Sequence, residues 1–200
     1  MKIATEEMAV TLFVVDKVRR GPAIIEFTES PIDSGGRLII VCGLPGSGKT
    51  THAKQLEVRL PAVRFCPDEW MDALSLDLWD EARRQKIESL QWEFAQLLLA
   101  HRETVIIEWG TWARSDRDAL RLRARELGAA VELHYISAPV DVLLDRIERR
   151  RMENPPISRE QLLEWAGVFQ APTGDETALF DHAVAVEIPT MGNRSKARTT

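Results

Sequence analysis

The sequence lacks several features that would point early to a class of function. Its two cysteines, Cys42 and Cys66, are too few for a disulfide framework or a four-cysteine zinc site, so we expect a reducing, cytoplasmic setting. No apolar run approaches the roughly 20 residues that span a bilayer. The N-terminal "MAVTLFVVDK" does not suggest a signal peptide, because it is too short, is preceded by Glu6 and Glu7, and lacks a small-residue cleavage site. The net charge of −5 lacks the basic excess of a dedicated nucleic-acid binder.

The bulk of the sequence is that of an ordinary globular protein. Its 44% hydrophobic and 28% charged residues over 200 positions suit one domain with a full core. Residues 1–36 look separate, because "AVTLFVV" and "AIIEFTE" are typical of short strands. They indicate either a β-hairpin or a mobile leader, since a lone hairpin needs a further partner to be stable. The polar tail over 190–200 is expected to be disordered.

An alternation of strands and helices begins at residue 37. "RLIIVC" (37–42) is continuously apolar, which is typical of a strand buried on both faces. Further strands are predicted over 62–66, 104–109, 130–137 and 180–188. Helices are predicted over about 48–58, 78–100, 115–128, 138–151 and 158–170. This order predicts an α/β fold over 37–189, with a five-stranded, mostly parallel sheet covered on both faces in three layers.

The clearest motif is a phosphate-binding loop between the first predicted strand and helix. "GLPGSGKT" matches G-x-x-x-x-G-K-T, in which glycines let several backbone N–H groups face one anion. Lys49 is expected to contact the β- and γ-phosphates, and the Thr50 hydroxyl to bind magnesium. The predicted nucleotide-binding residues are Gly43, Leu44, Pro45, Gly46, Ser47, Gly48, Lys49, Thr50 and Thr51.

Acidic residues follow the second and third predicted strands. Ligands of open parallel sheets bind beyond the carboxyl ends of the strands. Asp68, in "CPDEW", is therefore a candidate general base that accepts the proton of a hydroxyl during phosphoryl transfer. Asp68 also stands where a helix begins, and both roles can hold together. Glu108 is a candidate for holding magnesium; it would otherwise contact the acceptor or pair with a nearby arginine.

The segment after the third predicted strand offers contacts for an acceptor. Trp109 and Trp112 flank Gly110 and Thr111, and such rings form an acceptor wall or pack a helix on the sheet, with packing favoured for Trp112. Among the arginines of the next helix, Arg114 and Arg117 are nearest the strand end and are candidate acceptor contacts.

A basic helix end precedes the break "MENPP". Arg146 and Arg150 are four residues apart and so lie on one face. An arginine-bearing helix before a short segment near 150–158 suggests a lid that brings guanidinium groups to the transferred phosphoryl. The alternative is a basic helix C-terminus that matches the helix dipole, which explains one or two arginines more readily than four.

Taken in order, these motifs resemble the small P-loop kinases. The sequence is similar to predicted ATP-dependent kinases related to chloramphenicol phosphotransferase, zeta toxin and the kinase part of polynucleotide kinase, over about residues 37–189. The resemblance implies a five-stranded parallel sheet, ATP with Mg²⁺, and transfer to a hydroxyl. It also implies roles for Lys49 and Thr50 at the phosphates and metal, for Asp68 as base, and for Arg146 and Arg150 in the lid.

Three functions remain open on the sequence. The first is a kinase for a hydroxyl of a small molecule held between Asp68, Glu108 and the stretch from Trp109 to Arg117. The second is a polynucleotide 5′-hydroxyl kinase, which the acidic net charge disfavours. The third is an ATPase or nucleotide-gated binding protein that has no phosphate acceptor.

Overall fold

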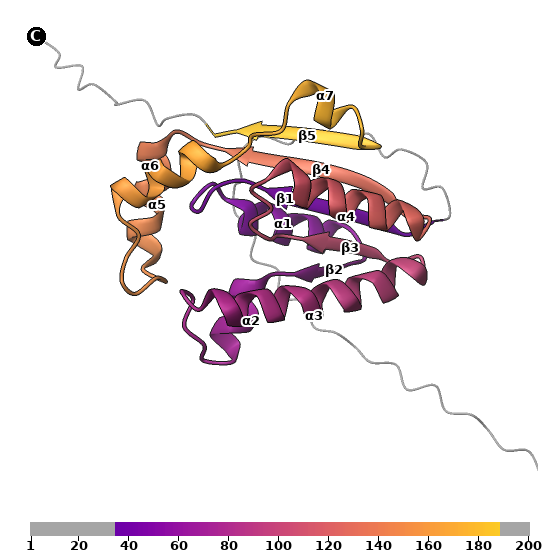
Figure 1. Ribbon diagram of the computed structural model, residues 1–200, viewed down its shortest axis with the longest axis horizontal. Helices are drawn as coiled ribbons and strands as arrows, with labels where there is room; N and C mark the ends of the chain where they lie inside the picture. Colours follow the sequence, from indigo (N-terminus) through magenta and orange to yellow (C-terminus); the bar gives the residue numbers. More distant parts are fainter. Residues whose placement is uncertain (1–34, 189–200) are drawn as a thin grey trace, which may run out of the picture. The chain divides into compact units, whose positions relative to one another are not determined.

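The computed structural model describes residues 35–188 of the chain. The hairpin or leader predicted for residues 1–36 lies outside this range except for its last two residues, and the predicted disordered tail lies wholly outside it. Five parallel strands form one sheet in the order β2-β3-β1-β4-β5 (Figure 1). The strands are β1 (Arg37–Cys42), β2 (Ala62–Phe65), β3 (Thr104–Ile107), β4 (Ala130–Ser137) and β5 (His182–Glu187). The predicted five-stranded parallel sheet is confirmed.

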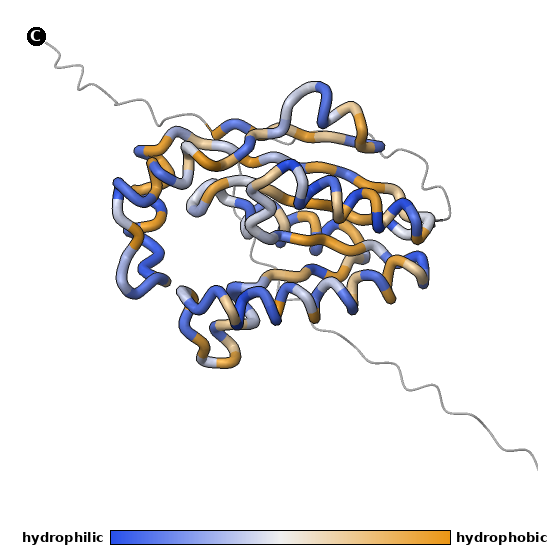
Figure 2. Tube along the Cα trace, viewed as in Figure 1, coloured by the Kyte–Doolittle hydropathy of each residue, from blue (hydrophilic) through white to orange (hydrophobic). Residues whose placement is uncertain are grey.

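The apolar run of β1 explains its central place in the sheet. Leu38 to Cys42 are fully buried, and β1 pairs with β3 on one side and with β4 on the other. The apolar residues after Arg37 let β1 be covered on both faces, which an edge strand need not be. Figure 2 shows hydrophobic residues concentrated along the central strands.

Seven helices and short helical turns accompany the strands within the described range. They are α1 (Lys49–Arg59), α2 (Pro67–Ala73), α3 (Glu81–Ala100), α4 (Arg114–Glu126), α5 (Val140–Arg150), α6 (Arg159–Val168) and α7 (Gly174–Thr177). Residues of α3 and α4 pack with alternate β1 residues in one core cluster, and residues of α1 pack with the other β1 residues in a second cluster. Two layers of helices thus cover the two faces of the sheet. None of the described helices combines the length and apolar character needed to cross a membrane.

Several element boundaries differ from those that the sequence suggests. The third strand ends at Ile107 rather than at residue 109, so Glu108 and Trp109 stand just beyond the sheet. Helix α3 begins at Glu81, after Asp80 caps it by accepting a hydrogen bond from the Arg83 amide. Helix α2 was foreseen only as a helix start, which Pro67 provides at the first helical position.

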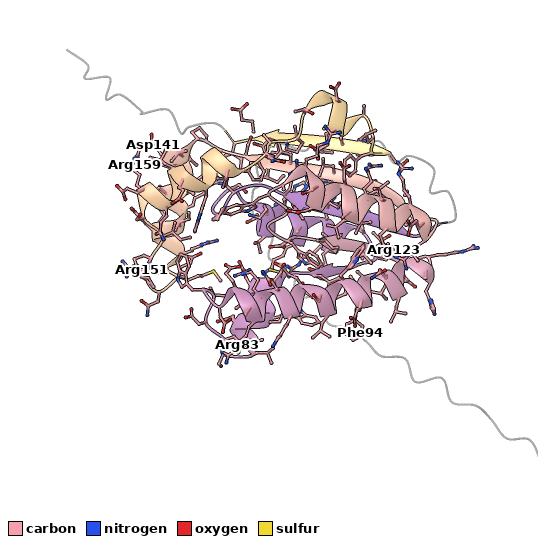
Figure 3. The ribbon with its side chains drawn as sticks, viewed as in Figure 1. Arg83, Phe94, Arg123, Asp141, Arg151 and Arg159 are labelled. Atoms are coloured by element: carbon pink, nitrogen blue, oxygen red, sulfur yellow. The ribbon has the colours of Figure 1, made fainter. Side chains whose placement is uncertain are left out.

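The carboxyl ends of the strands lie at the end of the sheet where α5 and α6 are found. In Figure 1 the arrows of β4 and β5 point toward the end of the sheet where α5 and α6 lie. The α5–α6 pair has its own small core, built on Leu143, Ile147 and Leu162. An ion pair of 2.7 Å between Asp141 and Arg159 also joins the two helices (Figure 3). The segment between these helices is therefore anchored at both ends beside the phosphate loop.

Candidate active site

The phosphate loop has a backbone that its glycines make possible. Gly43, Gly46 and Gly48 adopt φ values of 145°, 77° and 104°, which other residues rarely adopt. A Cβ atom at Gly43 would lie 2.2 Å from the carbonyl oxygen of Ile136, and one at Gly46 would lie 2.6 Å from that of Leu143. The loop therefore curls tightly against neighbouring backbone and leads directly into α1, whose N-terminus attracts anions.

Two side chains of the loop fit a bound phosphate. Lys49 Nζ donates hydrogen bonds to the carbonyl oxygens of Gly43 at 2.8 Å and Leu44 at 3.1 Å, which hold the ammonium group against the loop. Burial lowers the pKa of Lys49, while the negative charges of Asp68 and Glu108 oppose that effect. Ser47 Oγ is buried without a hydrogen-bond partner among the described residues. A cradle of glycines, a held ammonium and an unsatisfied hydroxyl together suit the phosphates of a nucleotide.

Glu108 and Thr50 lie together, as the metal hypothesis requires. The Thr50 hydroxyl donates a hydrogen bond to Glu108 Oε1, and the Glu108 side chain is only 2% exposed. Oxygens of this kind are the ligands that Mg²⁺ prefers. Among the described residues, no three His, Cys, Asp or Glu side chains gather to hold a metal ion. Thr50 and Glu108 would therefore contribute one or two ligands, and the nucleotide phosphates the others, as is usual for Mg²⁺.

Arg64 is a residue of this site that the sequence analysis missed. It lies on β2, and its Nη1 donates to Glu108 Oε2 at 2.9 Å. It also pairs with Glu57 at 2.9 Å and with Glu69 at 2.6 Å. The arginine partner suggested as an alternative for Glu108 therefore exists, and it holds the carboxylate in place beside Thr50. The signal for it was a single cation inside the apolar segment "AVRFC".

Asp68 lies at the second position of α2, beside the next strand end. Its Oδ1 accepts a hydrogen bond from Arg84 Nη1 of α3 at 2.5 Å, and Arg84 Nη2 donates to the carbonyl oxygen of Leu78 at 3.0 Å. The side chain of Asp68 is 44% exposed, so it can meet a ligand. The negative charge of Asp68 acts to raise the pKa of Lys49, against the larger effect of burial. The position of Asp68 in the first turn of α2 fits the predicted helix start, and its role as general base stays a prediction.

Of the two arginines predicted to act in a lid, Arg146 contacts the phosphate loop. Arg146 Nη1 donates to the carbonyl oxygens of Gly46 at 3.3 Å and Ser47 at 3.1 Å. Arg150 pairs with Glu153 and contributes to lowering the pKa of Lys49, after the larger effect of burial. Arg149 instead pairs with Asp145 on the exposed side of α5. Helix α5 thus brings Arg146 to the phosphate loop, and the role of Arg150 in a lid stays a prediction.

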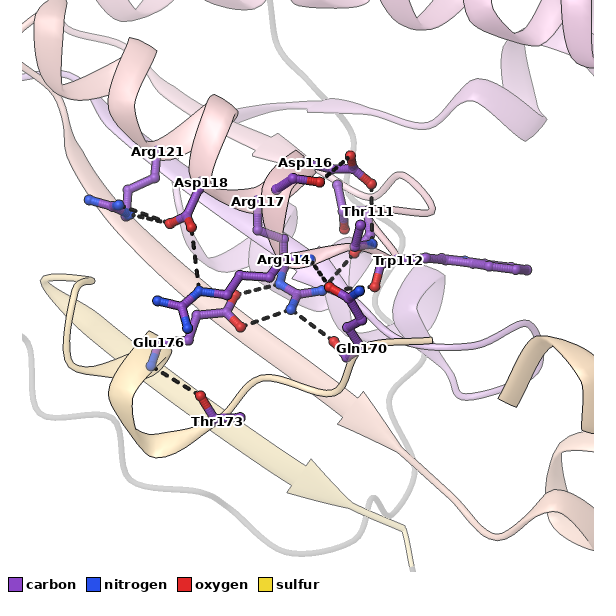
Figure 4. A network of polar contacts seen from close by, with 12 residues as sticks. Thr111, Trp112, Arg114, Asp116, Arg117, Asp118, Arg121, Gln170, Thr173 and Glu176 are labelled. Carbon is purple, nitrogen blue, oxygen red and sulfur yellow. Dashed lines mark hydrogen bonds and ion pairs between the residues drawn. The ribbon is translucent and has the colours of Figure 1, made fainter. Parts of the chain in front are cut away.

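The structure corrects the assignment of Arg117 as an acceptor contact. Arg117 is fully buried and forms a two-bond ion pair with Glu176, at 2.6 and 2.8 Å (Figure 4). Its remaining N–H groups donate to the carbonyl oxygens of Thr111, Trp112 and Gln170. No N–H group remains for a ligand, so Arg117 instead positions the loop after β3. Arg114 lies at the exposed start of α4 and pairs with Asp118 at 3.4 Å.

The two tryptophans after β3 have different surroundings. Trp109 is half-buried; its Nε1 donates to Gln91 Oε1 at 2.9 Å, and its ring meets Trp92 edge to face at 6.4 Å. Trp109 therefore packs α3 against the sheet, which is one of the two roles predicted for it, and a contact with the acceptor stays a prediction. Trp112 lies 5.6 Å from Trp165 between ring centroids.

A cluster of three tryptophans joins three segments near the lid. Trp165 of α6 lies between Trp112 and Trp79, with 6.2 Å between the ring centroids of Trp79 and Trp165. Trp79 Nε1 also donates to the carbonyl oxygen of Pro155 at 3.2 Å, which ties the lid segment to the start of α3. Residues so far apart in the sequence give no local signal of this cluster.

Comparisons with known proteins agree with this geometry. The model of the AAA domain family matches residues 38–172. A search of curated proteins found no match. Among solved structures, a candidate kinase from Chloroflexus aurantiacus j-10-fl is 21% identical, with 77% of this chain and 86% of that chain covered and a TM-score of 0.57.

Two further solved structures share the fold. Kti12 from Chaetomium thermophilum, in complex with ADP-AlF3, is 19% identical, with 75% of this chain and 88% of that chain covered and a TM-score of 0.57. A chain of the Pnkp1/Rnl/Hen1 RNA repair complex is 21% identical, with 69% of this chain but only 45% of that chain covered and a TM-score of 0.58. The fold of the small P-loop kinases, which the motifs suggested, is thereby confirmed.

Proposed function

We propose that this chain, which belongs to the AAA domain family through residues 38–172, is an ATP-dependent kinase for a hydroxyl group of a small molecule. One observation carries the proposal above all. Asp68 and Glu108 follow neighbouring parallel strands, and Glu108 accepts a hydrogen bond from Thr50 of the phosphate loop. A carboxylate beyond a strand end beside a triphosphate is the arrangement that transfer to a hydroxyl needs.

In the proposed reaction each group has one task. Residues 43–51 bind the phosphates of ATP, and Thr50 and Glu108 hold Mg²⁺, which when bound neutralises charge on the phosphate oxygens. Asp68 accepts the proton of the acceptor hydroxyl while that oxygen forms a bond to the γ-phosphorus. The bond from the γ-phosphorus to the bridging oxygen breaks, and ADP leaves with the electron pair. Arg146 and Arg150 stabilise the charge of the transferred phosphoryl group.

A polynucleotide 5′-hydroxyl kinase is the second candidate. The likeness to a chain of an RNA repair complex supports it at the level of the fold. A polynucleotide acceptor would need several cations along its path. The acceptor side instead carries Asp68, whose partner Arg84 offsets it, together with half-buried Glu88 and exposed Asp116. We therefore place the small-molecule acceptor first.

The test replaces the proposed base and leaves the rest of the site intact. Asp68→Asn should lower transfer from γ-labelled ATP to a metabolite pool by roughly 10²–10⁴-fold, because a positioned base contributes about that much. ATP binding, measured by calorimetry, should remain within about twofold, because the phosphate-loop contacts lie elsewhere. Asp72→Asn changes an exposed carboxylate on the same helix and serves as the control.

Three results would separate the candidates. Unchanged turnover of Asp68→Asn excludes Asp68 as the base. Label that appears on oligonucleotides and not on metabolites, with a steep fall as salt increases, favours the polynucleotide kinase. Release of phosphate to water without any labelled acceptor, undiminished in the variant, favours an ATPase or a nucleotide-gated binding protein.

A further inference from the structure

One face of helix α3 leads away from the proposed base. Arg84, Glu88 and Gln91 follow one another at spacings of four and three residues, so they lie in a row on the helix. Arg84 at one end holds Asp68, and Gln91 at the other end holds the indole N–H of Trp109 beyond β3. This row, which we call the α3 strip, therefore connects the proposed base with the carboxyl end of the neighbouring strand.

The α3 strip contains one buried polar group that no residue in the described part of the chain satisfies. Gln91 is fully buried, and while its Oε1 accepts from Trp109, its Nε2 has no hydrogen-bond partner. Glu88 is half-buried and forms no hydrogen bond or ion pair with any residue in the range 35–188. An unsatisfied buried donor costs about 1–3 kcal/mol. A fold tolerates such a donor most readily where a ligand completes it, and half-buried Glu88 on the adjacent turn is available to the same ligand.

The charges around Glu88 restrict that ligand. Burial raises the pKa of Glu88 to about 7, nearby Arg84 opposes this, and the carboxylates of Glu81, Asp68 and Asp116 increase it. The charge of Arg84 is already engaged by Asp68 at 2.5 Å. A phosphate or carboxylate group on the acceptor would therefore meet mostly like charge here.

We infer that the acceptor is an uncharged or cationic molecule rich in hydroxyl or amino groups, such as a sugar or amino sugar, and that Glu88 and Gln91 bind it beside Asp68. Glu88 accepts a hydrogen bond from a hydroxyl or ammonium group of the acceptor, and Gln91 Nε2 donates one to an acceptor oxygen. The inference rests on the proposed kinase function and adds to it the chemical class of the acceptor.

The first experiment divides a metabolite extract by ion exchange. Anionic, neutral and cationic pools are each incubated with the full chain, Mg²⁺ and γ-labelled ATP, and labelled products are identified by mass. The inference expects new phosphorylated products from the neutral or cationic pool. Products from the anionic pool alone would overturn the inference and leave the kinase function standing. No labelled product from any pool, with ATP binding retained, would instead contradict the kinase function itself.

The second experiment tests Glu88 on the product that the first one finds. Glu88→Ala should raise the KM for that acceptor at least tenfold with little change in the KM for ATP, because hydrogen bonds to charged groups are strong. Glu81→Ala removes the same charge from an exposed site two turns earlier on α3 and should leave both values within about twofold. Glu88→Gln, which keeps the size of the side chain, is measured beside it. An unchanged acceptor KM in both Glu88 variants would overturn the role of Glu88.

Discussion

The two sides of the site differ in how completely the protein satisfies its own polar groups. On the phosphate side, Lys49, Thr50, Glu108 and Arg146 all have protein partners, and Ser47 Oγ alone of the loop side chains stays unsatisfied. On the acceptor side, Gln91 Nε2 and Thr111 Oγ1 are buried without partners in the described chain. From this comparison we infer that the protein itself preorganises the phosphate side, and we propose that a ligand completes the acceptor side.

Among the variants that test this comparison, the largest effect is expected when Lys49, the cation of the phosphate loop, is replaced. Lys49→Met should lower kcat/KM for phosphoryl transfer by roughly 10²–10³-fold, because a charge aimed at the transferring phosphoryl is removed. Steady-state kinetics with the labelled acceptor measures this. Lys54→Met is the matched control, since Lys54 lies on the same helix, is 53% exposed and pairs with Glu69. Equal losses in the two variants would mean that the helix, and not the Lys49 ammonium, matters.

The next largest effect is expected on the stability of the fold, when the buried ion pair between Arg117 and Glu176 is broken. Arg117→Met should lower the free energy of unfolding by about 3 kcal/mol, because Glu176 would be left buried without its partner. Thermal unfolding should show a fall in Tm of about 6–12 °C. Arg114→Gln, at an exposed ion pair of 3.4 Å, should change Tm by no more than about 2 °C.

A double variant distinguishes the loss of packing from the loss of charge. Arg117→Met combined with Glu176→Leu removes both charges, so it should recover part of the lost Tm. A double variant less stable than Arg117→Met would show that the contacts of Arg117 with backbone carbonyls matter more than the ion pair.

A smaller effect should follow at the proposed metal position. Glu108→Gln should lower transfer by about 10²-fold and raise the Mg²⁺ concentration needed for half-maximal rate, because a carboxylate beside Thr50 is lost. Glu57→Gln changes the exposed partner of the same Arg64 and should leave the Mg²⁺ dependence unchanged. A Mg²⁺ dependence that is the same for wild type and Glu108→Gln would remove Glu108 from the metal site.

The same contrast explains what the sequence could predict. The phosphate loop is local: eight consecutive residues define its backbone, its cation and its hydroxyl, and the structure has that geometry. Asp68 and Glu108 could be placed because parallel strands end at one edge of a sheet. The roles of these residues in catalysis stay predictions.

The other parts of the site could not be predicted from the sequence, because they depend on contacts between distant segments. Arg117 was assigned to the acceptor because it stands near a strand end, but its partner Glu176 follows 59 residues later. Arg64 and the α3 strip carry no motif, since their meaning arises only when β2, β3 and α3 pack together. Sequence patterns report the periodicity of one segment, and they do not report which side chain of another segment it meets.

The smallest effect follows from the pKa of Glu88, raised by burial to about 7 from an ordinary value near 4.5. A carboxyl group whose pKa is higher in the folded state stabilises the fold below pH 4.5, and this contribution is lost as the pH rises through 7. Glu88→Gln should therefore raise Tm at pH 8 by about 2–4 °C, or about 1 kcal/mol, and leave Tm at pH 4.5 nearly unchanged.

Thermal scans from pH 4.5 to 8 measure this difference, with Glu81→Gln as the control for an exposed carboxylate on the same helix. A saturating concentration of the acceptor should reduce this gain in Tm at pH 8. The acceptor pairs with the Glu88 carboxylate of the wild type, and it binds the Glu88→Gln variant less tightly. A gain that is equal with and without acceptor would mean that Glu88 stays unpartnered in the complex, and the contrast between the two sides of the site would then lose its explanation.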